Sequence, residues 1–198
     1  MTVPLRTIVR PGDPPIEPLK KTRTAPPEPV VYFAYGSNMS TARMRKRTPS
    51  CEPLGIAALP GYALRFHKRS RDKSAKCNAF ASGNNNTVIG VLFRFDPAER
   101  AKLDEAEGVG AGYERATVTV INEEGRRRKA LIYLATPDYI DDSLKPYGWY
   151  KDFVLAGASE HGLPPEYIAD YIESVEATHD PKQDTRQQAA GRAGQSRT

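Results

Sequence analysis

Three acidic side chains close a helical stretch directly before a glycine-rich turn. The segment KLDEAEGVGAGYE carries Asp104, Glu105 and Glu107 just ahead of Gly108. A carboxylate in the last turn of a helix faces the negative end of the helix dipole, which is locally unfavourable. Asp104 and Glu105 are explained as solvated helix surface. Glu107 follows Leu103 by four residues and so points to the side on which Leu103 packs. Glu107 is therefore either an inward-facing general base or the frayed end of a helix.

A second polar group stands where an apolar strand stops. The stretch VVYFAYGSNMSTARMRKR leads from Val30 through Gly36, Ser37 and Asn38 into a basic helix. The free N–H groups of such a loop, together with a helix start, can bind an anion or an oxyanion. The alternative is a tight strand-to-helix connection that has Ser40 as its N-cap.

Covalent catalysis and metal chemistry are both disfavoured by the residues available. The context of Ser37, AYGSNMS, is not the G-x-S-x-G elbow of hydrolases, and no histidine lies nearby in the sequence. His67, His161 and His179 are scattered, and each is explained as a structural or solvated histidine. No cluster has metal-ligand spacing, and dinucleotide and P-loop fingerprints are absent. We therefore expect neither a metal nor a cofactor.

Residues 65–76 form a strongly basic segment, which we expect to be a long charged loop between two strands. Its only acid is Asp72, and its cations are Arg65, Lys68, Arg69, Arg71, Lys73 and Lys76. Three interpretations stay open: a solvated loop, a site for the carboxylate or phosphate of a small ligand, and a nucleic-acid contact.

Composition indicates one soluble domain between two polar tails. The formal net charge is +5, but residues 30–179 hold 20 basic and 19 acidic residues, so the charge lies mostly in the tails. Residues 1–29 contain eight of the 17 prolines and are expected to be an extended or disordered arm, and 180–198 a disordered polar tail. Cys51 and Cys77 suggest no disulfide framework, and no apolar run approaches a membrane span. We expect a cytoplasmic protein without a membrane partner, and a nucleic-acid partner is not expected.

The pattern of elements is that of an α+β domain. Alternating apolar residues predict strands at 31–35, 62–67, 77–82, 87–95, 115–121 and 129–135. Helices are predicted at 40–47, 97–107, 149–161 and 164–175, the second with Asp96 as its cap and Gly108 at its end. The turn-forming runs at 82–86 and 122–125 predict two hairpins.

Three segments together resemble the γ-glutamylcyclotransferase family and its avirulence-induced-gene-like relatives. YFAYGSNM resembles the family's substrate loop, and LDEAEGVGAGY resembles its segment with an acid before glycine and a tyrosine shortly after. WYKDFVLAGASEHGLPPEYIADY resembles its C-terminal helix and the G-L-P continuation. The resemblance spans residues 31–176. The stretch FHKRSRDKSAKCNAF departs from the animal members, which leaves the identity of the leaving group open.

The resemblance implies a mixed β-barrel-like sheet flanked by helices, in a single domain with one pocket. It also implies an enzyme that converts a small γ-glutamyl substrate into 5-oxoproline and releases the attached amine. Glu107 matches the catalytic glutamate, and Tyr113 and Tyr150 match pocket tyrosines. The substrate loop matches Tyr32, Phe33, Ala34, Tyr35, Gly36, Ser37 and Asn38.

Such a reaction needs no protein nucleophile, metal or cofactor, because the substrate's own α-amine attacks its γ-carbonyl. Glu107 would remove the amine proton and return it to the leaving nitrogen. The expected substrate is a small γ-glutamyl amino acid or amine. Glutathione, an ε-(γ-glutamyl)lysine-like amine and a peptide-like metabolite are the alternative sources of the leaving group. The alternative function is a non-catalytic module that binds a small ligand or nucleic acid through residues 65–76. The sequence does not indicate an oligomeric state.

Overall fold

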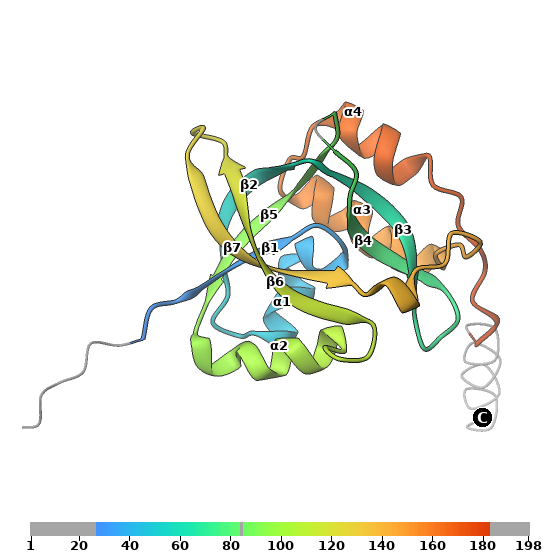
Figure 1. Ribbon diagram of the computed structural model, residues 1–198, viewed down its shortest axis with the longest axis horizontal. Coiled ribbons are helices and arrows are strands. Elements are labelled where there is room, and N and C mark those ends of the chain that lie inside the picture. Colours follow the sequence, from blue (N-terminus) through green and yellow to red (C-terminus); the bar gives the residue numbers. More distant parts are fainter. Residues whose placement is uncertain (1–26, 84, 183–198) are drawn as a thin grey trace, which may run out of the picture.

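The computed structural model describes residues 27–83 and 85–182 of the 198-residue chain. The predicted arm at 1–29 and tail at 180–198 lie mostly outside these described residues. Between them the chain forms the α+β arrangement that the sequence predicts, with a barrel of five strands and helices packed around it (Figure 1).

The barrel holds most of the hydrophobic core. Its order is β1–β5–β2–β6–β7, closed by a parallel contact between β1 and β7, while the other neighbours are antiparallel. The strands are β1 (Val30–Ala34), β2 (Glu52–Pro60), β5 (Thr87–Phe95), β6 (Tyr113–Asn122) and β7 (Arg127–Ala135). Along β6 the side chains of Val118 and Val120 are buried whereas Thr117 and Thr119 are exposed, as a half-buried strand requires.

Strand β2 is an element that the sequence analysis missed. Its sequence, EPLGIAALP, contains two prolines and a glycine, which are residues that weaken any strand signal. The structure accommodates them with a register shift between Pro53 and Gly55, where Gly55 has a φ of 107°. Sequence pattern cannot reveal this strand, because its pairing with β5 and β6 is what makes it a strand.

The basic segment at 65–76 is not the loop that we expected. Residues Tyr62–Arg69 form β3 and Ala75–Ala81 form β4, and the two pair antiparallel as a separate two-stranded sheet. Only 70–74 form the turn between them, and Lys68 is buried. The prediction failed because a long run of cationic residues suggests a solvent-exposed loop, whereas the apolar stems of lysine side chains can be buried in a sheet.

One of the two predicted hairpins is confirmed. Residues 123–126 connect β6 to β7, which pair directly. The turn at 82–86 instead leads from β4 into β5, and β5 pairs with β1 and β2 rather than with β4. Turn chemistry identifies a chain reversal, but it does not determine which strand becomes the neighbour.

The four predicted helices are present with small changes at their ends. The single turn η1 (Ser37–Met39) precedes α1 (Thr41–Arg47), and η2 (Pro97–Glu99) precedes α2 (Arg100–Glu107). Asp96 caps this second helix by accepting a 2.9 Å hydrogen bond from the Ala98 N–H, but the side chain of Ser40 accepts no capping hydrogen bond. The turn η3 (Pro137–Tyr139) follows β7, and the C-terminal helices are α3 (Gly148–Glu160), α4 (Pro165–Ile168) and the π-helical η4 (Ala169–Glu173).

The helices lie on different sides of the strands. In Figure 1, α2 lies beneath the barrel, whereas α3 and α4 lie on the side of β3 and β4, and α3 contacts η1. In the described ranges no helix has the length and apolar character that a membrane crossing needs.

Candidate active site

A cavity forms where β1, η1, β4, α2 and α3 meet. It is lined by Tyr32, Tyr35, Gly36, Ser37, Asn38, Cys77, Glu107, Tyr113, Tyr133 and Tyr150. The structure thus brings together eight of the ten residues that the sequence proposed, although they are spread from residue 32 to residue 150. The space within it that a water-sized sphere can occupy is about 30 Å³, and the cavity is partly open to solvent.

Phe33 and Ala34 are the two proposed substrate-loop residues that do not line the cavity. Both are fully buried in the hydrophobic core. Successive side chains of a strand point to opposite faces, so Phe33 is directed away from Tyr32 and its ring lies against Gly90. Neither residue contributes to the cavity wall, and their part in substrate binding stays a prediction.

Among the residues that the structure describes, Glu107 is the one carboxylate that lines the cavity. It is the last residue of α2, which ends because Gly108 takes the left-handed conformation (φ 69°) and donates its N–H to the Glu105 carbonyl, at 3.0 Å. The fully buried Leu103 anchors this helix to the core and so directs Glu107 inward. The helix end is an ordered cap, and the side chain of Glu107 is only 15% exposed.

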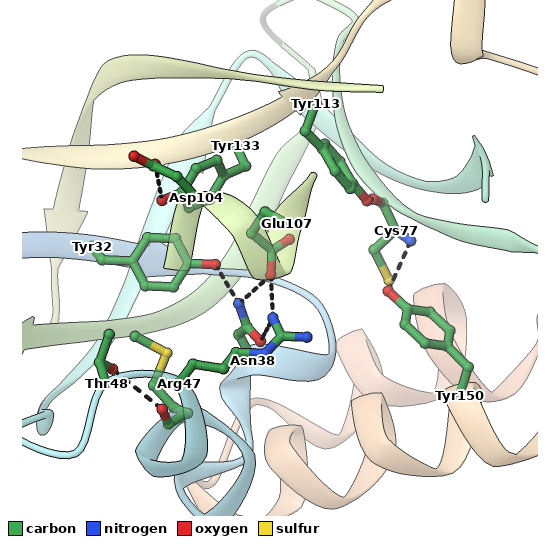
Figure 2. A network of polar contacts seen from close by, with 11 residues as sticks. Tyr32, Asn38, Arg47, Thr48, Cys77, Asp104, Glu107, Tyr113, Tyr133 and Tyr150 are labelled. Atoms are coloured by element: carbon green, nitrogen blue, oxygen red, sulfur yellow. Dashed lines mark hydrogen bonds and ion pairs between the residues drawn. The ribbon is translucent and has the colours of Figure 1, made fainter. Parts of the chain in front are cut away.

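Two donors hold one oxygen of the Glu107 carboxylate. The side-chain amide of Asn38 donates to Oε1 at 2.8 Å, and the guanidinium of Arg47 donates to the same oxygen (Figure 2). Arg47 also donates to Oδ1 of Asn38 at 2.6 Å, which fixes the orientation of the amide. In the described part of the chain, Oε2 receives no such hydrogen bond, and this leaves it available to exchange a proton with a ligand.

Arg47 is a site residue that the sequence analysis missed. It closes α1, and we had counted it only as part of a basic helix. The spacing could have indicated Arg47, because α1 begins directly after the loop that carries Asn38. Arg47 follows Asn38 by nine residues, at the end of this short helix. Its side chain is only 17% exposed, and its charge is paired with the carboxylate.

Five tyrosines surround these polar groups. The hydroxyl of Tyr32 accepts a 3.0 Å hydrogen bond from Asn38, and Tyr35 donates to the backbone carbonyl of Tyr133. Tyr113 donates to the carbonyl of Cys77, while Tyr150 accepts from the Cys77 N–H at 3.0 Å. Burial raises the pKa of all five phenols above the ordinary value, so they are neutral donors and acceptors.

Cys77 and Tyr133 are further lining residues that the sequence did not indicate. Burial raises the pKa of the Cys77 thiol to about 12, which makes it a neutral thiol rather than a nucleophile. Tyr133 donates to Asp104 at 2.8 Å, so Asp104 is bonded to the site wall instead of being the solvated residue that we expected. Neither residue has a local motif, because β4 of the two-stranded sheet and β7 of the barrel come to lie beside the cavity only in the folded chain.

Ser37 lines the cavity, and the hydrogen-bond partners of His67 and His161 are other residues. His67 bonds to Asp142 at 2.9 Å and to Asn78 at 3.0 Å, and His161 lies 3.2 Å from the Thr41 hydroxyl. Ser37 therefore sits in a polar loop rather than in a catalytic triad. Among residues 27–83 and 85–182, no cluster of three or more His, Cys, Asp or Glu side chains could hold a metal ion.

Comparison with known proteins adds to this geometry. A model of the AIG2-like family matches residues 87–171. The γ-glutamylcyclotransferase of Homo sapiens is 35% identical over 145 residues, which covers 71% of this chain and 76% of the human protein. A solved structure of a γ-glutamyl cyclotransferase is similar with a TM-score of 0.70 at 32% identity, covering 76% of this chain and 90% of that one. The structure of YkqA from Bacillus subtilis is similar with a TM-score of 0.65 at 29% identity, covering 77% of this chain and 57% of that one.

Proposed function

This chain belongs to the γ-glutamylcyclotransferase family, and we propose that it converts a γ-glutamyl amino acid or amine into 5-oxoproline and the free amine. The observation that carries the proposal is the single carboxylate of Glu107, which faces the Tyr35–Asn38 loop across the cavity with one oxygen held and the other available. This is the arrangement that an intramolecular acyl transfer needs.

Glu107 is the proposed acid and base. The α-amine of the substrate attacks the γ-carbonyl carbon, and the new N–C bond closes the five-membered ring. Oε2 of Glu107 accepts the proton that the amine gives up. The same oxygen then donates that proton to the departing nitrogen as its bond to the γ-carbon breaks. Because nucleophile and carbonyl belong to one molecule, the protein contributes mainly by folding the substrate into a reactive conformation.

The surrounding groups are the proposed cradle for the γ-glutamyl moiety. Gly36, Ser37 and Asn38 offer N–H groups at the start of a short helical turn, where the first N–H groups have no carbonyl partner within the helix. These groups are suited to the α-carboxylate or to the negative charge that develops on the γ-carbonyl oxygen. The neutral hydroxyls of Tyr113 and Tyr150 complete the opposite wall.

The test of this proposal replaces Glu107 with a group of equal size that cannot exchange a proton. Glu107→Gln is expected to stay folded and to lose 5-oxoproline formation by about 100-fold or more, as measured by chromatography of the product. Glu105→Gln is the matched control, since Glu105 lies on the same helix with its side chain exposed. Undiminished turnover by Glu107→Gln would contradict the role of Glu107 as acid and base.

The leaving group is tested with a panel of γ-glutamyl substrates. Glutathione, γ-glutamyl amino acids and an ε-(γ-glutamyl)lysine-like amine, each assayed for 5-oxoproline, would place the enzyme within or outside glutathione metabolism. We propose a cytoplasmic location, which is supported by two buried cysteines, Cys51 and Cys77, that are not joined in a disulfide. The alternative of a nucleic-acid contact through residues 65–76 stays a prediction: these residues form a hairpin in which Lys68 is buried, whereas Arg65, Arg69, Arg71 and Lys73 are exposed.

A further inference from the structure

A half-buried lysine lies behind one wall of the cavity. Lys76 is the second residue of β4, and its side chain is only 13% exposed. Its ammonium donates to Oδ2 of Asp72 and to Oγ of Ser74, both at 2.8 Å. The N–H and the hydroxyl of Ser74 donate in turn to Oδ1 of Asp72, at 3.0 and 2.8 Å. The turn of the β3–β4 hairpin therefore fixes the position of the Lys76 ammonium through charge-assisted hydrogen bonds.

The same ammonium lies over aromatic side chains at the start of α3. Its Nζ is 4.6 Å from the ring centroids of Trp149 and Tyr150, and 5.8 Å from that of Tyr147. A cation at such a distance is attracted by the negative face of the ring, and the attraction is stronger where water is excluded. Tyr150 is only 5% exposed, and burial lowers the pKa of Lys76. The contact between Lys76 and Tyr150 is therefore stronger than a cation–π contact at the surface.

Tyr150 is held at a second point by the residue that follows Lys76. The N–H of Cys77 donates a 3.0 Å hydrogen bond to the Tyr150 hydroxyl, and Figure 2 shows this contact at the cavity wall. A ring that is held only at its hydroxyl can still tilt about that point, whereas a second contact on the ring face prevents the tilt. Two consecutive residues of β4 thus determine together where the Tyr150 hydroxyl lies.

We propose that Lys76 is a positioning residue for Tyr150, which holds the ring so that the hydroxyl keeps its place in the cavity wall. The inference rests on the proposed function, in which Tyr150 contacts the γ-glutamyl moiety, and extends it to a residue outside the cavity. Lys76 does not touch the substrate in this scheme and acts through Tyr150. Without the ammonium, the ring tilts and the hydrogen bond between Cys77 and Tyr150 weakens.

The first experiment follows hydrogen exchange of the Cys77 amide by nuclear magnetic resonance, without any substrate. This amide reports on the Tyr150 hydroxyl because it donates to it. Lys76→Met keeps the apolar stem but removes the charge, and it is expected to speed the exchange by about 3- to 30-fold, which corresponds to the strength of a partly buried cation–π contact. Lys76→Arg is expected to preserve slow exchange, because a guanidinium also stacks on aromatic faces. Tyr150→Phe removes the acceptor and gives the full size of the effect.

The matched control lies in the turn of the same hairpin. Lys73→Met makes the same chemical change at an exposed position and is expected to leave the exchange of the Cys77 amide unchanged. Unchanged exchange in Lys76→Met would overturn the positioning role. Equally faster exchange of all amides in β3 and β4 would also overturn it, because it would show that Lys76 only stabilises the hairpin.

Steady-state kinetics tests whether this positioning affects the proposed activity. Lys76→Met is expected to lower kcat/KM for 5-oxoproline formation by about 3- to 30-fold, chiefly through KM, because Tyr150 is proposed to bind rather than to react. In a Tyr150→Phe background the same substitution is expected to have little further effect, since no hydroxyl is left to position. An equal loss in both backgrounds would overturn action through Tyr150.

The two experiments separate this inference from the proposed activity. If the wild-type protein forms no 5-oxoproline from any γ-glutamyl substrate, the proposed function is wrong, and faster exchange of the Cys77 amide in Lys76→Met still supports the positioning of Tyr150. If 5-oxoproline forms but neither the exchange nor kcat/KM changes in Lys76→Met, the proposed function stands and the role of Lys76 is overturned.

Discussion

At the scale of single residues, Arg47 has the clearest consequence for the chemistry. Its guanidinium bridges the Asn38 amide and the Glu107 carboxylate, and it thereby fixes which oxygen of Glu107 faces the cavity. Arg47 also connects the end of α1 to the end of α2, so a rotation of the Arg47 or the Glu107 side chain would break the contact between the two helices. We propose Arg47 as a positioning residue for the general base.

Substitution of Arg47 is expected to lower kcat without a comparable change in KM. In Arg47→Met, Glu107 keeps only the Asn38 hydrogen bond and samples other rotamers, so kcat for 5-oxoproline formation is expected to fall about 10-fold or more while KM changes little. Steady-state kinetics over a range of substrate concentrations measures both constants.

The control for this prediction lies on the same helix. Arg45→Met removes an equal charge from an exposed position and is expected to leave kcat and KM unchanged. A large rise in KM for Arg47→Met with kcat preserved would contradict positioning and would assign Arg47 to substrate binding.

At the scale of elements, helix α3 supports the loop that carries Asn38. Gly157 brings the helix backbone against η1 so closely that an added Cβ would lie 2.5 Å from the Ser40 nitrogen and 2.7 Å from the Met39 carbonyl carbon. Both atoms belong to the backbone, which cannot move aside as a flexible side chain can. The position of the loop is therefore determined by α3, which lies more than a hundred residues later in the sequence.

Gly157→Ala should disturb this support. The added methyl group is expected to push η1 away, to reduce the free energy of unfolding by about 1–3 kcal/mol and to lower kcat through displacement of Asn38. Chemical denaturation and the product assay measure the two effects on the same preparation.

A second glycine of α3 offers the comparison. Gly148 has open space around its Cβ position, so Gly148→Ala is expected to preserve both stability and kcat. Equal behaviour of the two variants would show that the contact between α3 and η1 does not determine the loop's position.

At the scale of the whole molecule, barrel closure buries the aromatic wall of the site. The five lining tyrosines come from β1, the residue after it, β6, β7 and α3, and they lie together only in the folded chain. Burial raises the pKa of each phenol, so the folded state holds these protons more tightly than the unfolded state does. Their contribution to stability is fully present below the unfolded pKa of about 10, and it is lost as the pH rises through the folded values.

An alkaline titration tests this burial. The five lining tyrosines and the buried Tyr167 are expected to ionise only when the protein unfolds. The phenolate absorbance above pH 10 should therefore stay below half of the denatured amplitude of the ten tyrosines until circular dichroism changes. Full phenolate absorbance from a still-folded protein would contradict the burial of the site.

Elements whose signals are local could be predicted from the amino-acid sequence. Leu103, Glu107 and Gly108 follow one another at helical spacing, so the helix, its end and the inward direction of the acid could be predicted together. The loop from Tyr35 to Asn38 could be identified because a buried strand stops at a glycine. The motifs around it also indicated the family and the α+β fold, and both are confirmed. The catalytic and binding roles of these residues stay predictions.

The contacts between residues far apart in the sequence could not be predicted, because they depend on the tertiary structure. Strand β2 has no pattern of its own, because its pairing partners supply the hydrogen bonds that make it a strand. Arg47 and Lys68 lie in basic runs, which predicted solvent exposure. In the structure Arg47 donates a hydrogen bond to Glu107, and Lys68 is buried against the ring of Tyr113. The physical reason is that the burial and charge pairing of a side chain depend on the residues that pack against it. In a closed barrel those residues lie far away in the sequence.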